Sequence, residues 1–195
     1  MNIQKVTVFC GSSTGFSSVY QENAEELGVF LVKNKISLLY GGGKLGLMGT
    51  LADSVLEQGG KVIGVIPDLL HREEVVHPKI HEVIVPKTMS ERKVLMSKMT
   101  DAYIIMPGGL GTLDELFEVL TLQQLQIEQK PVGLLNVNGF FNAMLEQLDF
   151  MVKEGFLKQQ GRELLIVAST VEDLMEKLLV YESPEKSAII NKIVK

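Results

Sequence analysis

The residues best suited to chemistry stand in one stretch, Pro107-Gly-Gly-Leu-Gly-Thr-Leu-Asp-Glu115, which follows a short apolar run. Its glycines keep side chains away from the backbone N–H groups and tolerate positive φ angles. Where such a loop opens a helix it binds anions, because free amides and the helix dipole point at the same place. We therefore predict a phosphate site here, with the Thr112 hydroxyl as a further hydrogen-bond partner and Glu115 one helical turn inside.

The same stretch has an interpretation that needs no ligand. Thr112 and Glu115 have the spacing of a capping box, in which the two side chains satisfy N–H groups at the start of a helix. Spacing by itself does not choose between capping and catalysis for Glu115.

A second candidate pair, Arg92 and Lys93, follows Ser90, which we expect to cap a helix. Cations stabilise the C-terminal ends of helices, so two of them near an N-terminus favour an anionic partner. A solvated pair is the alternative.

Gly41, Gly43 and Gly46 satisfy the pattern G-x-G-x-x-G of dinucleotide-binding loops. The pattern follows the second expected strand rather than the first, and no clear acidic residue closes the next strand at the expected distance. We therefore favour a mononucleotide site or a close strand-to-helix turn over an NAD site. A dinucleotide-dependent oxidoreductase built on these glycines is kept as a less favoured functional hypothesis. The three histidines lack the spacing of metal ligands, so no metal is expected.

The elements that must position these residues alternate regularly along the chain. Apolar runs predict strands at 6–10, 37–40, 61–66, 80–85, 102–106, 131–135 and 164–167, and apolar residues at helical spacing fill most of the intervals. This alternation predicts a single α/β domain over residues 1–183, a doubly wound, Rossmann-like parallel sheet with helices on both faces, followed by a tail at 184–195. In such sheets ligands bind beyond the carboxyl ends of the strands, where the loops at 11–13, 41–49 and 107–112 are expected.

Composition narrows the remaining possibilities. The chain has 195 residues, 46% of them hydrophobic, and a formal net charge of −5 with dispersed Lys and Arg, so we expect no nucleic-acid partner. No stretch has the length of a membrane span, and the N-terminal residues lack the apolar core of a signal peptide. The single cysteine, Cys10, has no disulfide partner within the chain and is expected to be buried. A cytoplasmic protein is the expectation.

These stretches together resemble the LONELY GUY family of cytokinin-activating phosphoribohydrolases, many of whose members carry the older label lysine decarboxylase-like. The family hallmark P-G-G-x-G-T-x-x-E is present at residues 107–115, and its M-x-x-R-K element at 89–93. Two further stretches, 41–49 and 130–139, are also similar to the family. The resemblance extends over roughly residues 6 to 180.

The resemblance implies hydrolysis of the N-glycosidic bond of AMP or an N6-modified, cytokinin-type nucleoside 5′-monophosphate, which releases the base and ribose 5-phosphate. It implies a homodimer and no cofactor, and it gives the catalytic roles to Arg92 and Glu115. The implied substrate-binding residues are Glu74, Arg92, Lys93, Gly108, Gly109, Leu110, Gly111, Thr112, Leu113, Asp114, Glu115 and Thr121. Nothing in the sequence marks a lysine as an anchor for pyridoxal phosphate, so the decarboxylase label does not fit. The alternative function is a purine mononucleotide-binding protein without turnover.

Overall fold

Seven parallel strands form the centre of the protein in the order β4-β3-β2-β1-β5-β6-β7. The computed structural model describes residues 2–73 and 76–182. The strands are β1 (Lys5–Phe9), β2 (Ser37–Tyr40), β3 (Val62–Val65), β4 (Glu82–Ile84), β5 (Ala102–Ile105), β6 (Val132–Leu135) and β7 (Leu165–Ala168). The doubly wound parallel sheet predicted from the alternation of elements is therefore confirmed.

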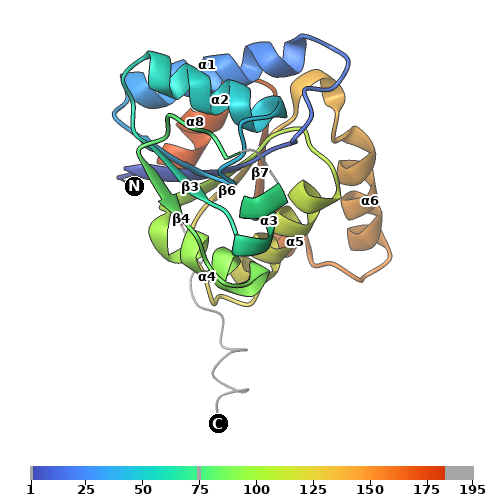
Figure 1. The fold of residues 1–195 in the computed structure, drawn as a ribbon. Coiled ribbons are helices and arrows are strands. Elements are labelled where there is room, and N and C mark those ends of the chain that lie inside the picture. Colours follow the sequence, from blue (N-terminus) through green and yellow to red (C-terminus); the bar gives the residue numbers. More distant parts are fainter. Residues whose placement is uncertain (1, 74–75, 183–195) are drawn as a thin grey trace.

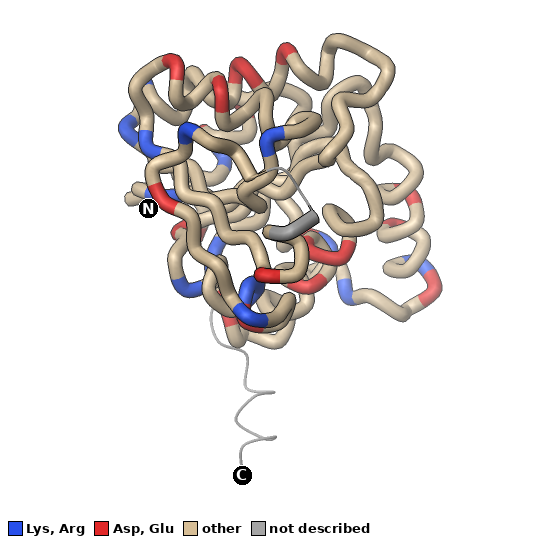
Figure 2. Tube along the Cα trace, in the orientation of Figure 1, with Lys and Arg blue, Asp and Glu red and all other residues tan. Residues whose placement is uncertain are grey.

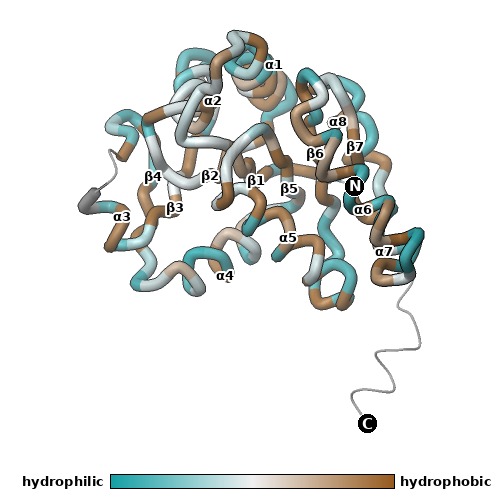
Figure 3. The backbone as a smooth tube through the Cα atoms, turned by 90° about the vertical axis from the view of Figure 1, so that its right-hand side faces the viewer, coloured by the Kyte–Doolittle hydropathy of each residue, from teal (hydrophilic) through white to brown (hydrophobic). Residues whose placement is uncertain are grey.

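Helices cover both faces of this sheet (Figures 1 and 3). The helices α1 (Val19–Lys33), α2 (Gly46–Glu57) and α8 (Val171–Leu179) share one hydrophobic core with the strands. The helices α4 (Met89–Met99), α5 (Leu110–Gln124) and α6 (Asn142–Lys153) pack into a second core on the opposite face. Shorter helices are α3 (Asp68–Glu73), η1 (Val137–Gly139) and α7 (Gln159–Arg162).

The central strands are buried on both faces, which explains why the sequence shows continuous apolar runs instead of strict alternation. In β1, Val6 and Val8 belong to the core beneath α1, whereas Phe9 belongs to the core beneath α4 and α5. Phe9 stacks on Tyr103 of β5, with ring centroids 6.0 Å apart. The two layers of helices are thus fixed to the sheet by alternate residues of the same strands.

The order of the strands creates a switch point between β1 and β5. The chain proceeds from β1 outward to β4, returns to β5 beside β1, and then continues outward to β7. The segments after β1 and β5 therefore lead to opposite faces of the sheet. Where these two segments leave their strands, the Gly11 N–H donates a hydrogen bond to the Pro107 carbonyl at 3.0 Å. Such a switch point is where open α/β sheets bind ligands.

The N-cap of α4 differs from the expectation, and two of the expected features lie outside the described residues. The cap of α4 is Thr88, whose hydroxyl accepts a hydrogen bond from the Glu91 N–H at 3.1 Å, so the prediction of a Ser90 cap is wrong. The reason is that Ser90 already lies within the first turn. The expected substrate residue Glu74 and the expected tail at 184–195 lie outside the described residues.

The distribution of charge and the character of the helices concern two further expectations, that of no nucleic-acid partner and that of no membrane span. Figure 2 shows Lys and Arg positions interspersed with Asp and Glu over several elements. Among the described residues, none of the helices combines the length and the apolar character that crossing a membrane requires.

Candidate active site

Arg92 and Glu115 meet at the carboxyl end of the sheet. Arg92 extends from α4 and Glu115 from the second turn of α5, with Arg92 Nη1 3.1 Å from Glu115 Oε1. Arg92 Nε donates to the Val65 carbonyl at 3.0 Å, so the guanidinium is held at two points. Both side chains are only 11% exposed, which leaves this pair weakly screened by solvent. The residues that the resemblance assigned to catalysis, 23 positions apart in the sequence, are thus in contact.

Glu115 has the most informative titration in the site. Burial raises its pKa from 4.5 to about 7, although the Arg92 guanidinium acts in the opposite direction. Asp114 and Glu118 raise the same pKa, and Lys93 lowers it. A carboxyl group that exchanges its proton near neutral pH is suited to acid–base chemistry.

The start of α5 shows that the capping-box interpretation is wrong. The helix begins at Leu110 with Gly109 as its N-cap, and it has no side-chain cap hydrogen bond. Thr112 is therefore already inside the first turn, and Glu115 lies too far along the helix to reach back to its start. The first N–H groups of an α-helix have no carbonyl partner within the helix, so they can bind an external anion.

The glycines of this loop have different roles. A Cβ atom on Gly108 would lie 2.1 Å from Thr112 Oγ1 and 2.9 Å from the Gly11 nitrogen, so this position is filled by the protein's own packing. A Cβ atom on Gly109 or Gly111 would meet nothing within 4 Å. The space in front of the helix N-terminus is therefore open to a ligand.

Lys93 forms ion pairs with two carboxylates on α5. Its Nζ lies 2.8 Å from Asp114 Oδ2 and 2.7 Å from Glu118 Oε2. Partial burial lowers the pKa of Lys93, but the hydrogen bonds to Asp114 and Glu118 outweigh this effect and raise it. Lys93 therefore stays charged beside the Arg92–Glu115 pair.

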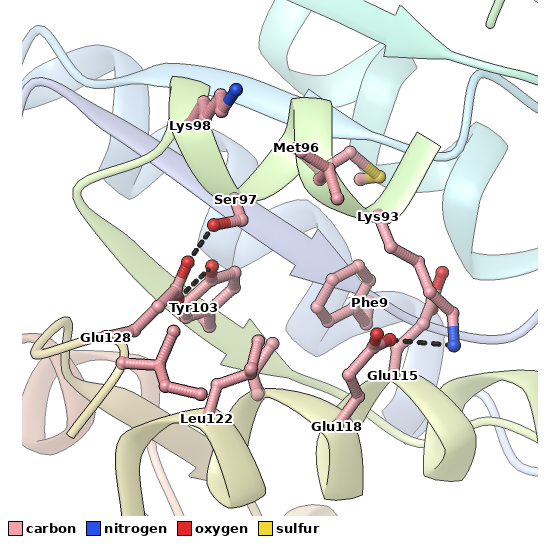
Figure 4. A pocket seen from close by; sticks show the side chains of 13 residues that line it. Phe9, Lys93, Met96, Ser97, Lys98, Tyr103, Glu115, Glu118, Leu122 and Glu128 are labelled. Atoms are coloured by element: carbon pink, nitrogen blue, oxygen red, sulfur yellow. Dashed lines mark hydrogen bonds and ion pairs between the residues drawn. The ribbon is translucent and has the colours of Figure 1, made fainter. Parts of the chain in front are cut away.

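A cavity of about 240 Å³ opens between α4 and α5 next to Glu115 (Figure 4). Its walls are largely apolar and include Phe9, Met96 and Val119. Glu115, Glu118 and Lys93 line it as well, while Glu128 accepts a hydrogen bond from Tyr103 Oη at 2.7 Å. A planar, partly apolar group could therefore lie beside the Glu115 carboxylate.

The glycine-rich segment at residues 41–49, after β2, packs against the site. A Cβ atom on Gly41 would lie 2.9 Å from Arg92 Nη2, so the guanidinium packs directly on this backbone. Gly46 has a φ of +63°, and a Cβ atom there would lie 2.2 Å from the Ser12 carbonyl carbon. These contacts favour the close strand-to-helix turn over a dinucleotide loop.

Two residues singled out in the sequence, Thr121 and Cys10, contribute less directly. Thr121 lies on the exposed side of α5, where its hydroxyl donates to the Phe117 carbonyl at 2.6 Å, and it lines a shallow groove together with Lys93. Cys10 is buried as expected; burial, and then the charge of Glu115, raises the pKa of its thiol and makes it a poor nucleophile. Within the described part of the chain, no group of three or more His, Cys, Asp or Glu side chains could hold a metal ion.

Sequence reasoning singled out Gly41 as part of a glycine pattern but missed its contact with Arg92, and it missed the Val65 carbonyl and Glu118. The Val65 carbonyl is a backbone atom, which leaves no signal in residue type. Glu118 did leave one, because Asp114 and Glu118 are four residues apart and so lie on the same side of a helix.

This chain is similar to known proteins over nearly its whole length. A family model described as possible lysine decarboxylase matches residues 48–178. The cytokinin riboside 5′-monophosphate phosphoribohydrolase LOG3 of Arabidopsis thaliana is 46% identical over 178 residues, which cover 91% of this chain and 83% of that protein. The probable cytokinin riboside 5′-monophosphate phosphoribohydrolase LOGL2 of Oryza sativa subsp. japonica is 45% identical over 190 residues, covering 97% of this chain and 78% of that protein. The chain belongs to the LONELY GUY family.

Solved structures show that the fold extends beyond close relatives of this LONELY GUY protein. A molybdenum cofactor binding protein from Rippkaea orientalis matches with a TM-score of 0.67 and 24% identity, covering 100% of this chain and 99% of that one. A structural genomics target solved by X-ray crystallography matches with a TM-score of 0.70 and 25% identity, covering 91% and 99%. At this identity, the likeness to the molybdenum cofactor binding protein concerns the fold alone.

The two kinds of glycine in the LONELY GUY motif lead to a paired prediction. We expect Gly109→Ala to melt like the wild type, because its methyl group meets open space, but to weaken binding of a 5′-monophosphate by about 10-fold or more, because the methyl group keeps the phosphate from the amides. Gly108→Ala should instead lower the melting temperature, because its methyl group displaces Thr112. Thermal melting and titration of both variants with AMP check this. Equal AMP affinity of Gly109→Ala and wild type would exclude the phosphate site.

Proposed function

We propose that this protein hydrolyses the N-glycosidic bond of AMP and of N6-modified, cytokinin-type nucleoside 5′-monophosphates, releasing an adenine-type base and ribose 5-phosphate. The observation that carries the proposal is the buried Arg92–Glu115 pair beside the open N-terminus of α5. The relatives named above, which are phosphoribohydrolases by name, support the same reaction.

The phosphate is proposed to bind the backbone amides of residues 109–112, with the Thr112 hydroxyl as an additional donor. Three features support this: α5 begins at Leu110, its dipole favours negative charge there, and the space beside Gly109 and Gly111 is open. The flanking residues Gly108, Leu110, Leu113 and Asp114 shape this binding site, and Glu74 is proposed as a substrate contact from the resemblance. A nucleoside without the 5′-phosphate should accordingly be a poor substrate.

Glu115 is proposed to act on the ribose and on the attacking water. Cleavage of the bond between C1′ and the base develops positive charge on the sugar, and an ionised carboxylate nearby stabilises it. The same carboxylate accepts the proton that water loses as its oxygen bonds to C1′. A pKa of about 7 leaves both protonation states accessible at neutral pH.

Arg92 is proposed to orient Glu115 and to donate a hydrogen bond toward the departing base. The base leaves with the electron pair of the broken bond, so a hydrogen-bond donor or a proton must meet it. Arginine is a poor proton source, which favours orientation and charge stabilisation as its contribution. Its anchoring by the Val65 carbonyl and by Glu115 supports a fixed orientation.

The direct test is a product assay. The purified protein is incubated with AMP, N6-isopentenyl-AMP, GMP, CMP and adenosine, and free base and ribose 5-phosphate are quantified by chromatography. We expect release from the adenine nucleotides and little from adenosine. Binding of AMP without any product after long incubation would refute the hydrolase proposal and support the non-catalytic alternative.

A homodimer is proposed from exposed apolar side chains that border the cavity and the groove of the candidate site. Val94 on α4 and Phe117, Leu125 and Ile127 on and after α5 are exposed apolar side chains, and a second copy could cover them. Thr121 lies on the same exposed side of α5, which would place it at the interface. Sedimentation should show a dimer for the wild type and for Val180→Asp, and a monomer when Val94 and Ile127 are both changed to Asp. A wild type that sediments as a monomer would exclude this assembly.

The proposed location is the cytoplasm. The cysteine is buried without a disulfide, which suits a reducing compartment.

A further inference from the structure

Lys93 and Glu118 form an ion pair between two hollows of the surface. Together with Leu122 they line both the cavity beside Glu115 and the shallow groove that contains Thr121. In Figure 4 Glu118 extends from α5 toward Lys93, close to Glu115. The pair therefore lies at the border of the proposed active site.

The geometry of Lys93 leaves one donor for a ligand. A lysine ammonium group carries three N–H donors. Two carboxylate oxygens, of Asp114 and Glu118, lie within 2.8 Å of Lys93 Nζ and can accept two of them. The third then has a restricted direction, so a long and flexible side chain has little rotamer freedom left to lose when a ligand binds.

Glu118 is the more effective of the two anchors. Its side chain is 37% exposed, whereas that of Asp114 is 61% exposed, so the contact with Glu118 is less screened. Glu118 also lines the cavity that contains Glu115, whereas Asp114 lines only the groove among these two hollows. Loss of Glu118 should therefore release Lys93 on the side that faces the substrate.

We propose that Glu118 is a positioning residue that holds the Lys93 ammonium so that its remaining N–H donates to a ribose hydroxyl of the bound 5′-monophosphate. The inference rests on the proposed function, which places the phosphate at the N-terminus of α5 and the sugar beside Glu115. Because Lys93 and Glu115 line the same cavity, a sugar beside Glu115 is within the space that the Lys93 side chain borders. Glu118 thereby contributes to recognition of ribose without touching the reacting atoms.

Initial rates with AMP, 2′-deoxy-AMP and 3′-deoxy-AMP test the role of Glu118. The measurements are made at pH 8.5, above the pKa of Glu115, so that changes in its ionisation have little effect. We expect Glu118→Gln to raise the KM for AMP about tenfold and to lower kcat much less, because a hydrogen bond from a charged group to the substrate is weakened. The substrate that lacks the contacted hydroxyl should show little change in KM. Asp114→Asn should have a smaller effect than Glu118→Gln.

A double-mutant cycle separates positioning from a general effect on folding. Lys93→Met should raise the KM for AMP as well, and adding Glu118→Gln to it should cause no further rise, because both changes remove the same contact. An unchanged KM in Glu118→Gln, an equal rise for all three nucleotides, or additive effects in the double variant would overturn the proposal.

A different result identifies failure of the proposed function itself. If the wild type releases no adenine from any of these nucleotides, the hydrolase proposal fails, and calorimetric titration with the same nucleotides decides the positioning role. Weaker binding of AMP by Glu118→Gln, with no change for one deoxynucleotide, would support it. Equal AMP affinity of the two proteins would overturn it.

Discussion

Glu115→Gln should release adenine from AMP at least about a thousandfold more slowly than the wild type, because an amide neither stabilises positive charge on the ribose nor accepts a proton from water. The substitution preserves the size of the side chain in a site that is 11% exposed. AMP binding should change far less than kcat, because the proposed phosphate contacts are backbone amides. Single-turnover rates and AMP titrations measure the two effects separately.

The same substitution should make the protein more stable at neutral and alkaline pH. The folded-state pKa of Glu115, about 7, lies above its ordinary value of 4.5, so ionising it costs stability as the pH rises through this range. The cost above pH 7 is on the order of 3 kcal/mol, and glutamine avoids it. Melting temperatures of the two proteins should therefore be similar near pH 4 and higher for Glu115→Gln at pH 8.

The matched control is Glu26→Gln, at an exposed position of α1. It should match the wild type in rate and melting temperature at both pH values. Wild-type adenine release by Glu115→Gln would show that another group performs the chemistry. A lower melting temperature for this variant at pH 8 would show that the loss of the Arg92 contact outweighs the release from buried charge.

Arg92→Met should lower kcat/KM for AMP by about a hundredfold or more and should also move its pH dependence. In the wild type, activity requires ionised Glu115 and should rise as the pH increases through about 7. Arg92 lowers the pKa of Glu115, and Lys93 does so to a smaller extent, whereas Asp114 and Glu118 raise it. Removing the guanidinium should therefore shift the acidic limb of the pH profile to higher pH.

Rates from pH 5 to pH 10 check both parts of this prediction. Arg162→Met serves as the control, because it removes the same charge and an ion pair with Asp149 on a different part of the protein. Its rate and pH profile should match those of the wild type. If Arg92→Met lowers the rate but leaves the acidic limb in place, Glu115 is not the group that sets this limb.

Glu115 and Arg92 also show why the site is expected to cost stability. The carboxylate and guanidinium are withdrawn from water, and their attraction does not fully compensate for this, as the raised pKa of Glu115 indicates. The core beneath them, which includes Phe9, Ile105 and Leu116, fixes the elements that hold the pair in place. Activity and stability are thus expected to change in opposite directions when Glu115 is neutralised.

The strands, the layered fold and the position of the glycine loop could be predicted from the sequence because they depend on local patterns. Short apolar runs bounded by glycine or proline specify buried strands, and their alternation with helices restricts the topology to a few arrangements. The glycine loop at 107–112 could be recognised because glycine is required where backbone must approach a ligand or a neighbouring segment. The catalytic roles of Arg92 and Glu115 were predicted through the resemblance. Their positions in the sequence do not distinguish catalysis from helix capping for Glu115, or an anion-binding role from simple solvation for Arg92.

Only the tertiary structure decided which residues touch. It shows that α5 begins at Leu110, which removes the capping role of Thr112 and Glu115, and that Arg92 lies against Gly41 and the Val65 carbonyl. It also brings Lys93 between Asp114 and Glu118. The physical reason is that these contacts join different elements, and their distances depend on how the helices pack on the sheet rather than on the spacing of residues along the chain.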